Sequence, residues 1–161
     1  EDFSHEKLVS RRFALAKTYG ADHCFDMTIA DDRTAFVETI MRETDKTGVD
    51  AALEMSGSYR AYEDAARVLR MGGTFSLLGI PSGTMQVDFA KNIIFSGITV
   101  HGIIGRRVFQ TWDQMEELLK AGLAKQLMKT GFVTHQLPLE RFEEGFEAIR
   151  SGDAYKVLFK P

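Results

Sequence analysis

The stretch Leu-Gly-Ile-Pro at residues 78–81 and the stretch His-Gly-Ile-Ile-Gly at residues 101–105 decide the predicted fold of this chain. Each continues an apolar run that is typical of a β-strand and that breaks into glycine at its carboxyl end. In a parallel sheet, the carboxyl ends of the strands form the edge where ligands bind. Two such strand ends in succession predict a dinucleotide-binding site.

The turn that usually accompanies such a site is missing. None of the 14 glycines belongs to a Gly-x-Gly-x-x-Gly pattern, which joins the first strand to the first helix and lets the backbone approach the pyrophosphate. We therefore interpret the chain as the later part of a cofactor-binding enzyme, beginning after its phosphate-binding loop.

Helical and extended segments alternate through the first two thirds of the sequence. The extended segments are nearly continuous apolar runs, which favour a parallel sheet covered on both faces. Asp31 and Asp32 precede one helix, where their carboxylates can accept hydrogen bonds from free amides. Helices are also predicted over residues 8–19 and 59–69, ending at Gly20 and at Gly72-Gly73, and strands within 21–26 and over 49–55, 74–80 and 98–104.

The predicted strands correspond to strands 3, 4, 5 and 6 of a doubly wound fold, whose strand order is 3-2-1-4-5-6. Strand 1 is absent, and strand 2 is absent or reduced to a few residues. A sheet with that gap exposes two unpaired inner edges, so we do not expect the chain to be a complete natural folding unit. The remaining segments are predicted as a helix over 111–123, a strand over 132–135, a helix over 139–150 and a strand over 156–160.

The composition excludes several classes of protein. The 161 residues are 44% hydrophobic and carry a net charge of -3 with mixed signs, which fits one ordinary core and no nucleic-acid-binding or membrane-binding face. No apolar run has the roughly 18 residues that cross a bilayer, and the acidic, polar start does not resemble a signal peptide. The lone Cys24 excludes an internal disulfide and a Cys-rich zinc site, and fits a reducing cytoplasm.

Residues 53–57, 77–81 and 102–119 together resemble the medium-chain dehydrogenase/reductase family. The stretch 102–119 is the most specific and most resembles members that oxidise L-threonine. The tail, in residues 133–135, 142–146 and 151–152, resembles the family more widely. The resemblance runs from about Arg12 to the end and covers only about half of a typical member.

The resemblance implies an NAD-dependent alcohol dehydrogenase with a catalytic zinc, whose zinc ligands, proton relay and glycine-rich turn lie outside this sequence. Residues 1–106 would form a partial dinucleotide-binding domain, and residues 107–161 a connecting helix and the C-terminal part of the catalytic domain. The expected reaction oxidises L-threonine to 2-amino-3-oxobutanoate, and the isolated chain is expected to be inactive. A polyol or secondary-alcohol dehydrogenase and a non-catalytic nucleotide-binding or assembly module are the alternatives.

The resemblance also implies which residues contact the cofactor. One group would line the nicotinamide side of the pocket, and a pair of isoleucines would hold the nicotinamide amide through backbone groups. Without the resemblance, residues 78–80 would be interpreted as a tight turn and the isoleucine pair 103–104 as part of a buried strand. Arg12 would be interpreted as a solvated helix residue. The implied contacts are Leu78, Gly79, Ile80, Ile103, Ile104 and Ser56, with Arg12 near the adenosine ribose.

The position that selects between NAD and NADP is occupied differently here. The acid that binds the ribose hydroxyls in the family aligns with Lys7, and the neighbouring Glu6 takes that role if the loop shifts by one residue. A lysine suits a 2'-phosphate, whereas a carboxylate repels it. The resemblance therefore favours NAD and leaves NADP open.

No catalytic residue or metal ligand is predicted within the chain. The four histidines and one cysteine have no zinc-ligand spacing, and His101 and His135 are interpreted as structural. Arg106 and Arg107 are either surface charges or a pair that holds a cofactor or a substrate carboxylate. The expected partners are a small alcohol or amino-acid substrate and further copies of the chain, in a dimer or tetramer built through the edge of strand 98–104.

Overall fold

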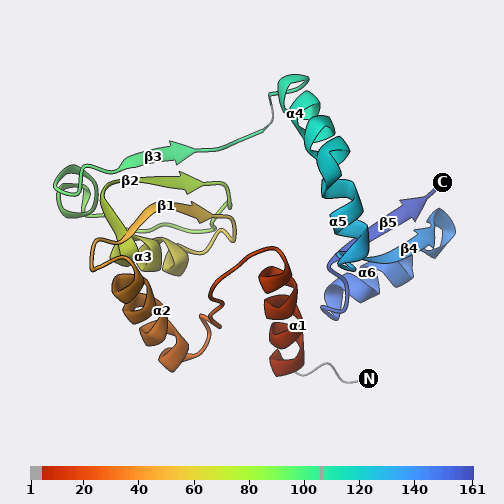
Figure 1. The fold of residues 1–161 in the computed structure, drawn as a ribbon, viewed down its shortest axis with the longest axis horizontal. Coiled ribbons are helices and arrows are strands. Elements are labelled where there is room, and N and C mark those ends of the chain that lie inside the picture. Colours follow the sequence, from red (N-terminus) through yellow and green to blue (C-terminus); the bar gives the residue numbers. More distant parts are fainter. Residues whose placement is uncertain (1–4, 106) are drawn as a thin grey trace. The chain divides into compact units, whose positions relative to one another are not determined.

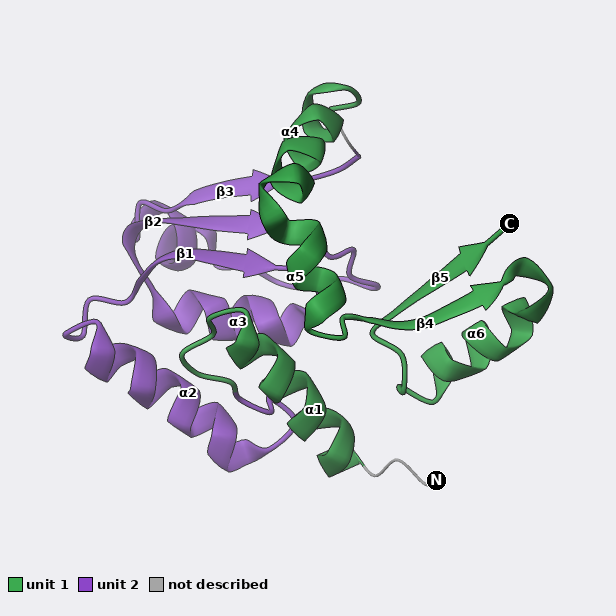
Figure 2. Cartoon of the chain, turned by 45° about the vertical axis from the view of Figure 1, so that its right-hand side comes forward, with its two compact units in different colours: residues 1–24, 107–161 green, residues 25–106 purple. Residues whose placement is uncertain are grey.

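The computed structural model describes residues 5–105 and 107–161 (Figure 1). The chain divides into two compact units, drawn in different colours in Figure 2. Residues 25–106 form one unit, and residues 1–24 together with residues 107–161 form the other. The domain boundaries implied by the family resemblance remain a prediction.

The unit of residues 25–106 is built on a parallel sheet. Its strands are β1 (Val49–Glu54), β2 (Leu69–Leu77) and β3 (Thr99–Gly102), in the order β1-β2-β3. The helix α3 (Tyr59–Val68) forms the crossover from β1 to β2 and packs on both strands. A π-helical turn η1 (Ala90–Ile94) lies between β2 and β3, and α2 (Ala30–Glu43) precedes β1 and contacts α3. The predicted α/β class with a parallel sheet is confirmed.

The small core of this unit lies between α3 and the sheet. Val68 and Phe75 are buried, and the ring of Tyr62 meets that of Phe75 edge-on at a centroid distance of 5.7 Å. The order β1-β2-β3 matches strands 4, 5 and 6 of a doubly wound sheet. Within the described residues, the edge of β1 that faces away from β2 pairs with no strand.

The strand predicted within residues 21–26 is wrong, because these residues form an irregular connection. A strand needs a neighbour to pair with, and the described part of the chain offers this segment none. The amide of Asp26 donates instead to the Asp32 carboxylate at 2.8 Å. Asp32 therefore braces the preceding loop, while Ile29 occupies the N-cap of α2 without a side-chain hydrogen bond.

The boundary between α3 and β2 also differs from the prediction. The helix ends at Val68 and β2 begins immediately at Leu69, so Gly72 and Gly73 lie inside the strand rather than at the end of a helix. The pairing shifts from Val49↔Leu69 to Ala51↔Thr74, and the surplus residues of β2 form a bulge. Gly72, with φ +70°, supplies the left-handed conformation that this bulge uses.

The other unit contains α1 (His5–Thr18), α4 (Gln110–Leu118), a π-helical turn η2 (Leu119–Leu123) and α5 (Ala124–Lys129). The strands β4 (Val133–Pro138) and β5 (Lys156–Lys160) pair in parallel, joined by the 3-10 turn η3 (Leu139–Arg141) and α6 (Phe142–Arg150). The single helix predicted over 111–123 is interrupted, because Gly122 adopts φ +123°. None of the described helices is both long and apolar enough to span a bilayer.

Gly48 tests how tightly β1 is held against the start of β2. Its φ is +94°, and a Cβ there would lie 2.5 Å from the Val68 carbonyl oxygen and 2.9 Å from the Arg70 amide nitrogen. We expect Gly48→Ala to lower the free energy of unfolding by about 3 kcal/mol, because left-handed strain and a clash with backbone add. The matched control is Gly83→Ala, at φ +83° with open space around it, which should cost about 1 kcal/mol. Urea titrations of the full-length protein that give equal losses for the two variants would contradict this account.

Candidate cofactor-binding edge

Three loops meet at the carboxyl edge of the parallel sheet. They comprise residues 55–58 after β1, residues 78–82 after β2 and residues 103–105 after β3, and Figure 1 shows the three arrowheads pointing the same way. Backbone hydrogen bonds continue the pairing into the loops. The amide of Leu78 donates to the Glu54 carbonyl and the amide of Ile103 to the Leu77 carbonyl, each at 2.9 Å.

A buried carboxylate organises the first of these loops. Glu54 is only 5% exposed, and its Oε1 accepts hydrogen bonds from the Ser56 amide at 2.7 Å, the Gly57 amide at 2.9 Å and the Ser56 hydroxyl. Burial by itself raises the pKa of the Glu54 carboxyl, but the bonds from Ser56, Gly57 and Ser58 outweigh burial and leave the pKa below its usual value. Glu54 is therefore a buried anion at neutral pH.

The loops after β1 and β2 touch through glycine. A Cβ on Gly79 would lie 2.1 Å from the Gly57 nitrogen, and a Cβ on Gly57 would lie 2.7 Å from the Ile80 carbonyl oxygen. Only glycine permits so close an approach of two backbones. The glycines of this edge therefore hold two loops together, beyond the tight turn that residues 78–80 predict on their own.

Six of the residues implied as cofactor contacts lie on this one edge: Ser56, Leu78, Gly79, Ile80, Ile103 and Ile104. Ile80 is 88% exposed and Ile104 is 92% exposed. The alternative interpretation of Ile103-Ile104 as a buried strand is wrong, because β3 ends at Gly102 and both side chains follow it in the open. Apolar side chains exposed beside backbone groups are what a flat, partly polar ring requires.

The implied adenosine contacts lie in the other unit. Glu6, Lys7 and Arg12 are exposed residues of α1. The guanidinium of Arg12 lies 5.8 Å from the centroid of the Tyr155 ring and borders a cavity of about 440 Å³. Arg106 lies outside the described residues.

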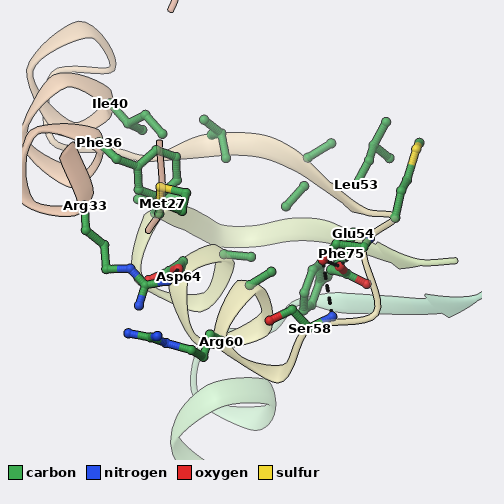
Figure 3. Close-up of a pocket in the computed structure, with 18 of the residues that line it drawn as sticks. Met27, Arg33, Phe36, Ile40, Leu53, Glu54, Ser58, Arg60, Asp64 and Phe75 are labelled. Atoms are coloured by element: carbon green, nitrogen blue, oxygen red, sulfur yellow. Dashed lines mark hydrogen bonds and ion pairs between the residues drawn. The ribbon is translucent and has the colours of Figure 1, made fainter. Parts of the chain in front are cut away.

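A larger cavity, of about 880 Å³, lies between α2, β1 and α3 (Figure 3). In the close-up, Arg33, Arg60 and Asp64 lie at one end, and Leu53 and Glu54 lie at the other. Arg33 donates to the Asp64 carboxylate at 2.8 Å, and the rest of the lining is mainly apolar. Five of the six residues of β1 line the cavity. The side of β1 that faces away from β2 pairs with no described strand, and a further strand of a doubly wound sheet would lie there.

The chain does not provide a zinc site in its described part. No group of three or more His, Cys, Asp or Glu side chains is placed to hold a metal ion there. His101 is exposed in β3, and His135 Nε2 lies 3.7 Å from an Asp153 oxygen. The catalytic zinc of the resemblance therefore finds no ligand set among these residues.

Two features of the site were missed in the sequence. Glu54 is the last residue of β1, and an acid at a strand end, two and three residues before Ser56 and Gly57, is the signal that could have identified it. The pairing of Arg33 with Asp64 joins residues on different helices, and no local pattern indicates it.

Comparisons with known proteins agree with this geometry. Residues 7–121 match the family described as zinc-binding dehydrogenase. The L-threonine 3-dehydrogenase of Bacillus velezensis is 40% identical over 150 residues, and that of Symbiobacterium thermophilum is 37% identical over 150 residues; each match covers 93% of this chain and 41% of the relative. The chain thus spans less than half the length of these relatives.

Two solved structures are similar over nearly the whole chain. An alcohol dehydrogenase from Thermotoga maritima has a TM-score of 0.82 at 25% identity, covering 93% of this chain and 40% of that one. The 2R,3R-butanediol dehydrogenase from Bacillus subtilis has a TM-score of 0.77 at 28% identity, covering 94% and 41% respectively. These matches support a Rossmann-like fold.

Because the folded pKa of Glu54 lies below its usual value of 4.5, the Glu54 carboxylate stabilises the protein fully above about pH 5. That contribution is lost as the pH falls below 4.5 and through the lowered folded pKa. We expect Glu54→Gln to reduce the fall in unfolding free energy between pH 6 and pH 3, measured by urea titration. The exposed Glu63→Gln is the control and should follow the wild type. An unchanged acid profile in Glu54→Gln would show that Glu54 keeps an ordinary pKa.

Proposed function

The chain belongs to the zinc-binding dehydrogenase family, and we propose that the whole protein oxidises L-threonine with NAD as the hydride acceptor. The carbon that bears the 3-hydroxyl gives a hydride to the nicotinamide ring, and the hydroxyl proton is released. L-threonine thereby becomes 2-amino-3-oxobutanoate, and NAD⁺ becomes NADH plus a proton. The convergence of three parallel strand ends on one edge is the observation that carries the proposal.

The residues of this edge would bind and orient the nicotinamide. The exposed side chains of Leu78 and Ile80 would cover one side of the ring and exclude water from it. The backbone groups of Ile103 and Ile104, which lie beyond the end of β3, would hold the ring's carboxamide. Ser56 would border the same space from the loop after β1.

The catalytic zinc does not fit the described residues, since these offer no metal-binding group. In the proposal, the metal ligands and the groups that handle the hydroxyl proton are supplied outside these 161 residues, and the chain contributes the cofactor side of the active site. The chain alone is expected to have no dehydrogenase activity.

Threonine is the substrate that the relatives support best. The B. velezensis and S. thermophilum relatives are both L-threonine 3-dehydrogenases. The similarity to 2R,3R-butanediol dehydrogenase favours a secondary alcohol or polyol as the second candidate. Because both classes present a secondary hydroxyl to the same cofactor, the edge of the sheet serves either.

NAD is proposed over NADP because the family resemblance favours it, with Glu6 in the role of the ribose-binding acid if the loop is shifted by one residue from Lys7. The first turn of α1 carries both Glu6 and Lys7, so a carboxylate for the ribose hydroxyls and an ammonium for a 2'-phosphate stand at adjacent positions. Arg12, about one and a half turns further along α1, would lie near the adenosine ribose.

The activity is tested by following NADH formation by the full-length protein with L-threonine, sorbitol and 2,3-butanediol, each with NAD and with NADP. We expect L-threonine with NAD to give a kcat/KM at least about tenfold above the other pairs, since binding a charged amino acid requires groups that a neutral polyol leaves unpaired. Turnover of 2,3-butanediol or sorbitol, with no turnover of L-threonine, would retain the family chemistry and reject threonine as the substrate. NADH binding without turnover of any alcohol would favour a non-catalytic nucleotide-binding module.

The same proposal includes a homo-oligomer, a dimer or tetramer built through the free edge of β3. Within the described residues, β3 pairs only with β2. Large apolar side chains are exposed before and along β3: Phe89, Ile94, Phe95 and Val100. An exposed strand edge with apolar neighbours is a common site of association.

Val100→Pro tests this edge. Ile103 donates its amide to β2, and alternate residues of a parallel strand bond to one side, so the Val100 amide faces the open edge. Proline removes that donor, and we expect the oligomer to shift to a smaller species in size-exclusion chromatography with light scattering. Val100→Ala keeps the donor and should retain the wild-type size. An unchanged oligomer in both variants would place the interface elsewhere.

A further inference from the structure

We propose that Glu54 is a positioning residue for the nicotinamide: its buried carboxylate holds the loops after β1 and β2 in their binding geometry before the cofactor arrives. The inference rests on the proposed function, because it assigns a role in binding a dinucleotide. It goes beyond that function because the residue has its effect through Ser56 and residues 78–80 and does not itself contact the cofactor.

The burial of Glu54 calls for an explanation. A carboxylate withdrawn from water is costly unless hydrogen bonds replace its hydration. Glu54 ends a strand of otherwise apolar or small inner residues, and 5% of it is exposed. A leucine or glutamine could fill the same volume without a buried charge, so the carboxylate contributes more than packing.

The hydrogen bonds of Glu54 show what that contribution is. Its side-chain Oε1 fixes the loop after β1 through the amides of Ser56 and Gly57. Its backbone carbonyl accepts the amides of Leu78 and Gly79, at 2.9 and 3.2 Å, and so fixes the loop after β2. One residue therefore holds two of the three loops that carry the proposed nicotinamide contacts, the loops after β1 and β2.

The contact between Gly57 and Gly79 makes the conformation of the loop after β2 depend on that of the loop after β1. Gly57, held by the carboxylate, lies against the Ile80 carbonyl, and Gly79 lies against the Gly57 nitrogen. If the loop after β1 loosens, the loop after β2 loses the wall against which it packs. The second carboxylate oxygen, Oε2, is buried without a hydrogen-bond partner among the described groups and adjoins Gly79, so the negative charge also lies at this contact.

The hydroxyl of Ser56 is committed to the same network. It donates to Glu54 and accepts from the Ser58 amide at 3.2 Å. Its proton is therefore oriented toward the carboxylate rather than toward the open edge. Ser56 would accordingly present its backbone and its Cβ to the cofactor, with the hydroxyl serving the loop.

Glu54→Gln is the central variant. The side-chain oxygen of glutamine can accept some of the three hydrogen bonds that Ser56 and Gly57 donate. Its NH₂ group, however, would either face those same donors or lie beside Gly79 with no acceptor. The backbone bonds to Leu78 and Gly79 remain, so the variant isolates the carboxylate. We expect the Kd for NADH of the full-length protein to rise about tenfold, because the loop must then be ordered at the time of binding.

Two further variants separate positioning from general stability. Asp64→Asn removes another buried carboxylate of the same unit, 7% exposed and paired with Arg33 at the far end of the larger cavity, and should leave the Kd unchanged in the folded protein. Glu54→Asp keeps the charge and can still accept the Ser56 amide as an Asx turn does, so its Kd should stay within about threefold of the wild type. A Kd in Glu54→Gln equal to that of the wild type would overturn the proposal, as would an equal rise in Asp64→Asn.

Hydrogen exchange of the wild-type protein tests the same idea without a variant. The amides of Ser56, Gly57 and Leu78 should be protected before NADH is added, because Glu54 already holds them. Protection that appears only with NADH would overturn preorganisation. A wild type that binds neither NADH nor NADPH would overturn the proposed function, and Glu54 would then be left with no cofactor to position.

Discussion

Parallel pairing along β2 is the interaction on which the rest of the unit of residues 25–106 depends. Since β2 pairs with β1 on one side and β3 on the other, all three carboxyl ends must lie at one edge. That constraint requires a crossover of α3 between β1 and β2 and a long return through η1 to β3. It also brings together loops that are separated by about two dozen residues in the sequence and gives them a shared surface.

The sequence predicts this sheet because its strands are apolar runs that each end in glycine. This pattern can be recognised in each segment alone, without knowing which strands pair. Strand boundaries were less accurate. Gly72-Gly73 resembles a helix stop, yet the chain uses the pair for a bulge inside β2, because pairing with β1 resumes at Thr74. Residues 21–26 have strand composition but no partner in the described chain, and pairing decides whether such a segment becomes a strand.

The cofactor edge shows the same division between local and distant information. The family resemblance indicates Ser56, Leu78 and Ile80, which lie on one edge, whereas the sequence around Glu54 indicates only a strand residue. Its importance depends on the Gly57 and Gly79 backbones, which the fold brings from two loops. Periodicity and spacing indicate which residues face a core, but they do not show which buried acid has found enough donors to stay charged.

The unit of residues 1–24 and 107–161 combines segments from both ends of the chain, which has a consequence for the order of events during folding. Every pairing in the sheet of residues 25–106 is made between segments close in the chain. By contrast, the Arg11–Asp153 ion pair at 2.8 Å joins residues 142 positions apart. Contacts between distant segments form late, because the two ends of the long intervening chain must first be brought together, and that costs conformational entropy. During synthesis, α1 therefore leaves the ribosome before the segments of residues 107–161 that it contacts. The sheet that holds Glu54 can fold before those segments are made.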